Sequence, residues 1–270
     1  RDLIKDAFDG IEQVEVIDNI MIDEILREAK IPRDVILVQS MAQVLGKRIG
    51  GDYILSGAYR IRQLGDKERL VVSVRLFDLR KEAMIDLKSN VFEVNNPDEF
   101  RQLIVPEVLK SLNIDFAEPV ESFLYDPQLI FPLYRAVDKM DEALRTYGSA
   151  QFPDKPLWKE AFAEAQETID TVPNYLESYY YLAYMYQKTG WLAKEVETMM
   201  KYVELLEGSG REKNSIQRAT RAYLRLANSY LSQKKYEMAE ESINQALQIN
   251  PEIAEAYFLL GKIAYDQGKS

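Results

Sequence analysis

The chain has 270 residues, 47% of them hydrophobic and 29% charged, which is a globular composition long enough for two domains. Its net charge of −10 disfavours polyanionic partners such as nucleic acid or an anionic membrane leaflet. Histidine and cysteine are absent, which excludes the commonest general base, thiol nucleophiles, disulfides and thiolate metal sites. No apolar run approaches the roughly 18–20 residues that a membrane-spanning helix needs.

Residues 1–118 mix helical and strand periods. Leu3–Phe8 has helical spacing and stops at Gly10. Alternation around Val14 and Val16 predicts a short strand over Glu12–Asp18. Two more helices are expected: one carrying Ile22–Ala29 and ending near Pro32, and one with Asp34 as N-cap, closed by Gly50-Gly51.

Three strand-like runs follow. Gly65-Asp66 lies between the first two and predicts a hairpin with a longer loop. Leu70, Val72, Val74 and Leu76 share one face of the second run, and the polar residues between them predict that the other face is partly wet. The runs are Tyr53–Arg62, Leu70–Leu79 and Met84–Val94, and a helix over Asp98–Leu112, with Pro106 as a candidate kink, follows them.

The strand pattern ends before Leu129, and several prolines punctuate the passage. We therefore predict an α+β chain with a domain boundary near residue 118. A linker and a leading helix (at about Gln128–Tyr147) are expected over 119–156, and an all-α helical solenoid over 157–270.

The last third of the chain repeats. Residues 220–253 are followed at Ala254 by the same pattern, and Leu226 and Leu260 are 34 apart (260 − 226). A step of 34 is the period of tetratricopeptide repeats, which stack pairs of antiparallel helices. The first of these segments carries the full set of large, small and proline positions of that family: Tyr223, Leu226, Ala227, Tyr230, Ala239, Ile243, Ala246 and Pro251.

An upstream repeat matches in its first helix through Tyr179, Leu182, Ala183 and Tyr186. Its second helix has Glu195 where the family has a small residue. The step from Leu182 to Leu226 is 44 (226 − 182), so about ten residues are inserted around GSGREKNS. Ala161 and Pro173 fit the second helix of a degenerate first repeat. Residues 157–270 thus resemble the tetratricopeptide-repeat family.

That resemblance implies a protein-binding concave groove lined by the first helix of each repeat. Carried onto this chain, the partner-binding residues are Tyr180, Tyr184, Arg221, Asn228, Phe258 and Tyr265. The alternative is that these rings only pack against neighbouring repeats. The carboxylate clamp of chaperone-binding members needs lysine where Tyr180 and Leu224 stand, so that partner class is rejected.

The segments LGKRIGGDYILSGAYRIR and RLVVSVRLFDLRKEAMIDLKS resemble the α/β domain of TolB (amino-terminal part), CsgG and LpoB over about residues 2–112. Two departures are noted. An apolar strand that usually opens the family domain is not found before Asp2, so we expect either a strand lying upstream or an incomplete domain. The turn after Asp78 reads LRKEAM, where family members commonly carry Thr-Gly.

The sequence contains no pattern typical of catalysis. Gly46, Gly50, Gly51 and Gly57 fit neither phosphate-binding glycine motif. Adjacent carboxylates such as Glu240 and Glu241 point apart on a helix. We therefore expect a non-enzymatic scaffold without cofactor or metal, binding protein partners through the groove and the α/β domain.

The resemblances imply a periplasmic cell-envelope assembly in bacteria, for secretion, cell wall or flagella, with any lipid anchor or signal lying upstream of Arg1. Because the chain begins without methionine and stops inside a repeat, it is expected to be a fragment or processed product. Three alternatives stay open: a cytosolic regulatory module of a signalling protein, an enzyme with an unrecognised carboxylate site, and a homo-oligomer formed through the last helix.

Overall fold

The computed structural model describes residues 8, 11, 14, 16–17, 19–31, 37–64, 67–87, 90–93, 97–114, 127–148, 154–208 and 212–268. The chain divides into two compact units, Arg1–Pro127 and Gln128–Ser270. The boundary predicted near residue 118 lies in 115–126, outside the described residues.

The first unit begins its described helices with α2 (Asn19–Glu28), which agrees with the predicted stripe, and α3 (Gln39–Ile49). α3 starts later than expected, with Val38 rather than Asp34 as its N-cap. Its end is as predicted, because Gly50 has φ 72° and donates its N–H to the carbonyl of Gly46. The strand predicted around Val14 and Val16 is wrong, since neither residue is in a strand, and most of the helix predicted over Leu3–Phe8 lies outside the described residues.

The sheet is antiparallel and is built on β2 (Lys67–Asp78), which pairs along its whole length with β1 (Tyr53–Leu64). Leu64 pairs with Lys67, so the hairpin has a two-residue connection and not the longer loop expected. The third predicted run is split into β3 (Ala83–Asp86) and β4 (Asn90–Glu93), both paired with β2 on the side away from β1.

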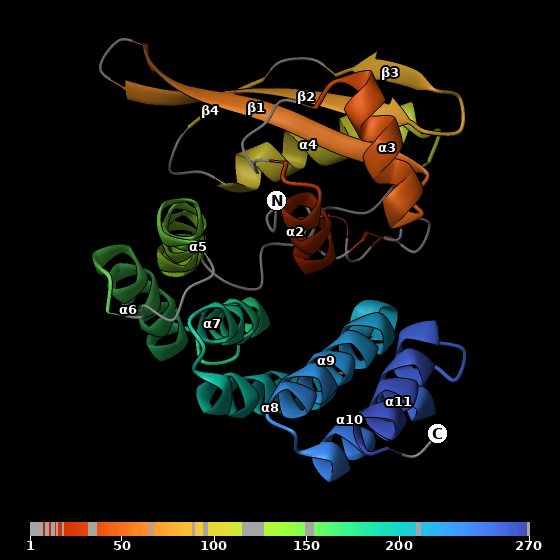
Figure 1. The fold of residues 1–270 in the computed structure, drawn as a ribbon. Coiled ribbons are helices and arrows are strands. Elements are labelled where there is room, and N and C mark those ends of the chain that lie inside the picture. Colours follow the sequence, from red (N-terminus) through yellow and green to blue (C-terminus); the bar gives the residue numbers. More distant parts are fainter. Residues whose placement is uncertain are drawn as a thin grey trace. The chain divides into compact units, whose positions relative to one another are not determined.

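The core of this unit lies between β2 and α4 (Pro97–Ser111), which continues through Pro106 and lies behind the sheet in Figure 1. Val72 and Val74 of β2 pack with Ile104 and Val108 of α4. Ser73, on the opposite face, is exposed, so the predicted wet face is confirmed there. Val14 and Val16 are partly buried against this cluster and are not in a strand.

The turn after β2 is held by Asp78, whose carboxylate accepts the backbone N–H groups of Arg80 and Lys81 at 3.1 and 2.9 Å. The N–H of Lys81 is the largest influence that lowers the pKa of this carboxyl. Glu82 has φ 52°, a left-handed conformation that favours glycine. Asp78, the last residue of β2, therefore stabilises the turn that follows the strand.

The second unit is entirely helical in its described residues (Figure 1). Its helices are α5 (Pro127–Tyr147), α6 (Pro156–Thr171), α7 (Leu176–Lys188), α8 (Leu192–Gly208), α9 (Glu212–Ser232), α10 (Tyr236–Ile249) and α11 (Ala254–Asp266). Successive helices from α6 to α11 pack on one another. The order of antiparallel pairs α7–α8 and α9–α10 agrees with the predicted repeats.

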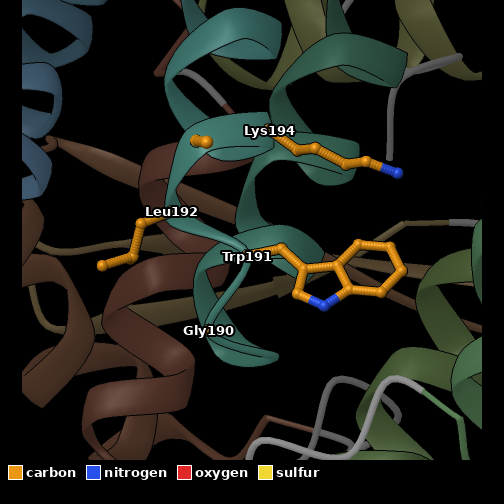
Figure 2. Close-up of a pocket in the computed structure, with 5 residues that line it drawn as sticks. Gly190, Trp191, Leu192 and Lys194 are labelled. Atoms are coloured by element: carbon orange, nitrogen blue, oxygen red, sulfur yellow. The ribbon is translucent and has the colours of Figure 1, made fainter.

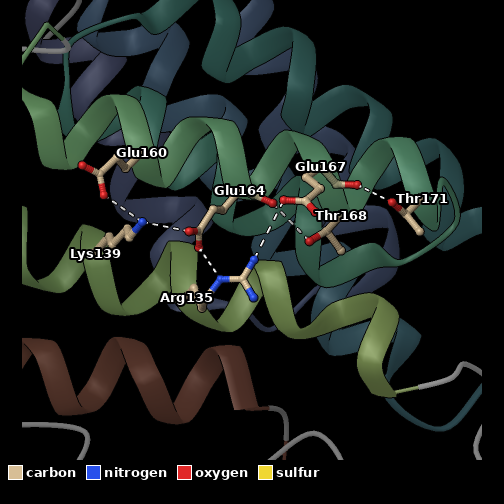
Figure 3. Close-up of polar contacts among 7 residues, drawn as sticks. All are labelled: Arg135, Lys139, Glu160, Glu164, Glu167, Thr168 and Thr171. Carbon is tan, nitrogen blue, oxygen red and sulfur yellow. Dashed lines mark hydrogen bonds and ion pairs between the residues drawn. The ribbon is translucent and has the colours of Figure 1, made fainter.

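An ion-pair network joins α5 to α6 (Figure 3). Lys139 lies 2.8 Å from carboxylate oxygens of both Glu160 and Glu164, and the Nε of Arg135 lies 3.2 Å from Glu164. The two glutamates raise the pKa of Lys139. Arg135 and Lys139 of α5 are thus paired with carboxylates of α6, which indicates a structural network that orients the leading helix.

A tyrosine hydroxyl donates a hydrogen bond at each of three junctions that precede the first helix of a repeat. Tyr179 donates to the carbonyl of Pro173, and Tyr257 donates to the carbonyl of Pro251, both over 2.8 Å and six residues. Tyr223 holds the equivalent position at the inserted junction, where it donates to a carboxylate oxygen of Glu207 at 2.8 Å. Burial, with this carboxylate as the next cause, raises the pKa of Tyr223 to about 12.

Candidate functional site

The candidate binding surface is formed by the first helices of the repeats, and the structure divides its predicted residues into buried and accessible ones. Tyr180 and Tyr184 lie on one side of α7 and are only 6% and 9% exposed. The guanidinium of Arg225, on α9, lies 4.8 Å from the ring centroid of Tyr180 and 5.1 Å from that of Tyr184. Tyr202 of α8 makes an edge contact with Tyr180 at 5.9 Å. Both tyrosines therefore pack between repeats, which is the alternative the sequence left open.

Glu195 of α8 completes this cluster. Its side chain is 1% exposed, and Oε1 lies 3.7 Å from Nε of Arg225, which is itself 10% exposed. That distance makes an ion pair but is too long for a hydrogen bond. Burial raises the pKa of Glu195, while Ser229, Arg225 and Gln187 act in the opposite direction. Glu195 thus replaces the small residue that the family has at this position, and its carboxylate pairs with a cation of the following repeat.

The part of the insertion from Glu212 onward lengthens α9. α9 begins at Glu212, eight residues before the repeat that starts at Thr220. Arg218 in this added segment donates to Glu177 of α7 at 3.1 Å, and both side chains are buried. The insertion therefore adds a buried ion pair between α7 and α9, beside the Glu195–Arg225 pair that joins α8 to α9.

The accessible part of the surface lies on α11. Phe258 and Tyr265, seven residues apart on one face, are 71% and 83% exposed. Lys262 is exposed between them. On α9, Arg221 is exposed, and Asn228 is half-buried and donates to the carbonyl of Leu224 at 3.2 Å. Of the six predicted residues, Phe258, Tyr265 and Arg221 are the ones most open to a partner.

An aromatic stack that the sequence reasoning missed lies at the turn between α7 and α8. The rings of Phe162, Tyr186 and Trp191 are 5.0–5.8 Å apart and nearly parallel, and Lys194 lies 4.4 Å from the Trp191 ring. Figure 2 shows Trp191 and Lys194 pointing the same way, on the opposite side from Leu192. Residues 190–194 line an adjacent hollow of about 430 Å³. The one sequence signal was a tryptophan directly after a turn glycine.

Within the described ranges, no group of three or more acidic side chains is arranged to hold a metal ion. Over the same ranges, none of the helices combines the length and apolar character required to cross a bilayer.

Comparison with known families identifies residues 220–253 as a tetratricopeptide repeat, the segment that forms most of α9 and all of α10. A repeat of this class supports a role as a protein-interaction scaffold. No curated protein matches the chain. The resemblance of residues 2–112 to the TolB, CsgG and LpoB domain stays a prediction.

Two solved structures are similar to parts of this chain. One is described as "Crystal structure of MamA", with 19% identity, 48% of this chain and 85% of that chain covered, and a TM-score of 0.23. The other is described as "Crystal structure of MamA protein", with 21% identity, 51% and 84% covered, and a TM-score of 0.25. Likeness at these TM-scores carries no argument about this protein.

Proposed function

We propose that this protein is a non-enzymatic scaffold that binds a segment of a partner protein on the exposed face of α11 and the adjoining part of α9. The observation that carries this proposal is the exposure of Phe258 and Tyr265 on one helix face, beside a complete tetratricopeptide repeat. Aromatic side chains give large contact area with few rotatable bonds, and they are enriched at binding hot spots.

The chemistry of this face specifies the segment it would accept. Phe258 and Tyr265 offer two apolar contacts about 10 Å apart along the helix axis, from seven residues at 1.5 Å each. Lys262 lies between them, and Arg221 is exposed on α9. The segment that fits has two apolar side chains with an acidic residue between them.

We place the scaffold in a bacterial cell-envelope assembly, facing the periplasm. Support for this placement comes from the resemblance of the first unit to TolB, CsgG and LpoB domains, and from the absence of cysteine, which suits that compartment. The first unit would then dock on one component and the repeats on another. The absence of histidine and cysteine and the paired state of the buried carboxylates Glu177 and Glu195 support a non-enzymatic role.

The test is a pull-down from the native host with the full-length protein and the double variant Phe258→Ala/Tyr265→Ala. Met238→Ala is the matched control, because Met238 is 43% exposed on α10, outside the face. The proposal predicts that a specific envelope protein is retained by wild type and the control and lost with the double variant. Retention by all three proteins would refute the binding face, and capture of cytosolic regulators alone would refute the envelope placement.

A further inference from the structure

Glu195 and Arg225, which form an ion pair, both stand where the following repeats have apolar residues. Glu195 stands where the next repeat has Ala239, 44 residues on (195 + 44 = 239). Arg225 stands where the following repeat has Leu259 (225 + 34 = 259). Ala239 and Leu259 are 0% and 3% exposed, so this location is apolar and buried in one junction and ionic and buried in the other.

The buried ion pair of Glu195 and Arg225 is a poor way to stabilise the fold. Burial raises the pKa of Glu195, which means that the charged carboxylate loses more on burial than its neighbours return. The Nη1 and Nη2 atoms of Arg225 are buried without a hydrogen-bond partner. In some proteins, buried polar groups select one arrangement of helices.

Arg225 is placed to orient the first helix of the preceding repeat. Its guanidinium lies over the rings of both Tyr180 and Tyr184, at the distances expected for cation–π contacts. Those rings are one turn apart on α7, while the carboxylate of Glu195 comes from α8. One side chain of α9 therefore contacts both helices of the pair before it.

We propose that Glu195 and Arg225 form an orienting latch, in which the carboxylate on α8 fixes the guanidinium and the guanidinium fixes Tyr180 and Tyr184. The latch sets the angle between the α7–α8 and α9–α10 pairs, across the junction that carries the ten-residue insertion. It is independent of what the face on α11 binds, so it can fail while the proposed function holds, and the reverse.

The first test is a double-variant cycle at neutral pH. Arg225→Leu alone leaves a buried carboxylate without its cation and is expected to raise the unfolding equilibrium constant by about 100-fold or more. Adding Glu195→Ala to that variant is expected to bring the constant back to within about tenfold of wild type. Changes that simply multiply, with no recovery in the double variant, would overturn the latch.

The second test separates orientation from stability. The chain has no cysteine, so spin labels attach only at Glu197→Cys on α8 and Asn244→Cys on α10, two exposed positions. The latch predicts a narrow distance distribution in the otherwise wild-type protein and a shifted or broadened one when Glu195→Ala/Arg225→Leu is added, although that double variant regains stability. An unchanged distribution in the stable double variant would contradict an orienting role.

Discussion

Helix pairs α7–α8 and α9–α10 differ at several buried positions of their second helices, and the one that changes charge holds Glu195 in the first pair and Ala239 in the second. In the second pair, close packing of small and apolar side chains brings the helices together, as in the family pattern. In the first pair, a carboxylate reaches Arg225 of the next repeat and the tyrosines reach the same guanidinium. The same helical repeat thus tolerates different chemistry when both partners change together.

The largest expected effect comes from placing the buried glutamate of the α7–α8 pair at the equivalent position of the α9–α10 pair. Ala239→Glu places a carboxylate at a fully buried site whose counterpart is Leu259, so about 3–5 kcal/mol of unfolding free energy should be lost. Adding Leu259→Arg should recover part of that loss. Urea unfolding of both variants measures it, with Met238→Glu, at an exposed neighbouring position, as a control expected to change little. A loss no larger than that of the control would show that the site is not dry.

The pH dependence of stability should also distinguish the two pairs, because the α7–α8 pair has a titratable group, Glu195, where the α9–α10 pair has Ala239. The folded pKa of Glu195 is raised above its usual 4.5, so the folded state binds this proton more readily than the unfolded state. Stability relative to Glu195→Gln should therefore be highest below pH 4.5 and fall as the pH rises through the folded pKa. Urea midpoints of both proteins from pH 4 to 7 check this. A wild type that gains on the variant with rising pH would mean that Arg225 outweighs burial.

The junction tyrosines extend the comparison to the inserted segment. Tyr223→Phe removes the hydrogen bond to Glu207 and should cost about 1 kcal/mol, as should Tyr179→Phe at the regular junction. Burial raises the pKa of both tyrosines, that of Tyr223 to about 12, so the stability that Tyr223 contributes should persist to pH 10 and be lost as the pH approaches 12. Spectrophotometric titration of wild type and Tyr223→Phe should differ by one late-titrating phenol. Identical titrations would contradict the contact.

The smallest expected change in stability concerns the small residue in the first helix of each repeat, which is Ala227 in α9 and Gly261 in α11. Ala227 of α9 is fully buried, whereas a Cβ added at Gly261 of α11 would meet nothing within 4 Å. Gly261→Ala should stabilise the unit by about 0.5–1 kcal/mol through helix propensity, and Ala227→Gly should do the opposite. Thermal unfolding of the two variants measures both changes, and a destabilising Gly261→Ala would show that something packs on that side of α11.

Periodicity predicted the repeats well, because Leu226 and Leu260 record packing that recurs every 34 residues. It predicted accessibility poorly. Tyr180 and Phe258 hold equivalent places in their repeats, yet one is 6% and the other 71% exposed. Arg225 covers Tyr180 from a helix 45 residues on (225 − 180), and Tyr202 of α8 contacts the same ring. No local pattern encodes such a contact. The stack at Trp191 was missed for the same reason, since Phe162 joins it from α6.

In the first unit, the β1–β2 hairpin followed from alternation and glycine, while Val14 and Val16 showed the same alternation without forming a strand. Alternation specifies which side chains share a face and does not by itself specify a strand. The two valines obtain burial against the sheet–helix core instead.

The central claim is that α11 presents the accessible part of a protein-binding face and that α7 does not. In-cell photo-crosslinking from position 265 (83% exposed), with position 184 (9% exposed) as the matched control, tests it directly. We predict an adduct with one envelope protein from position 265 and none from position 184. No adduct from position 265, or the same adduct from both positions, would contradict this account.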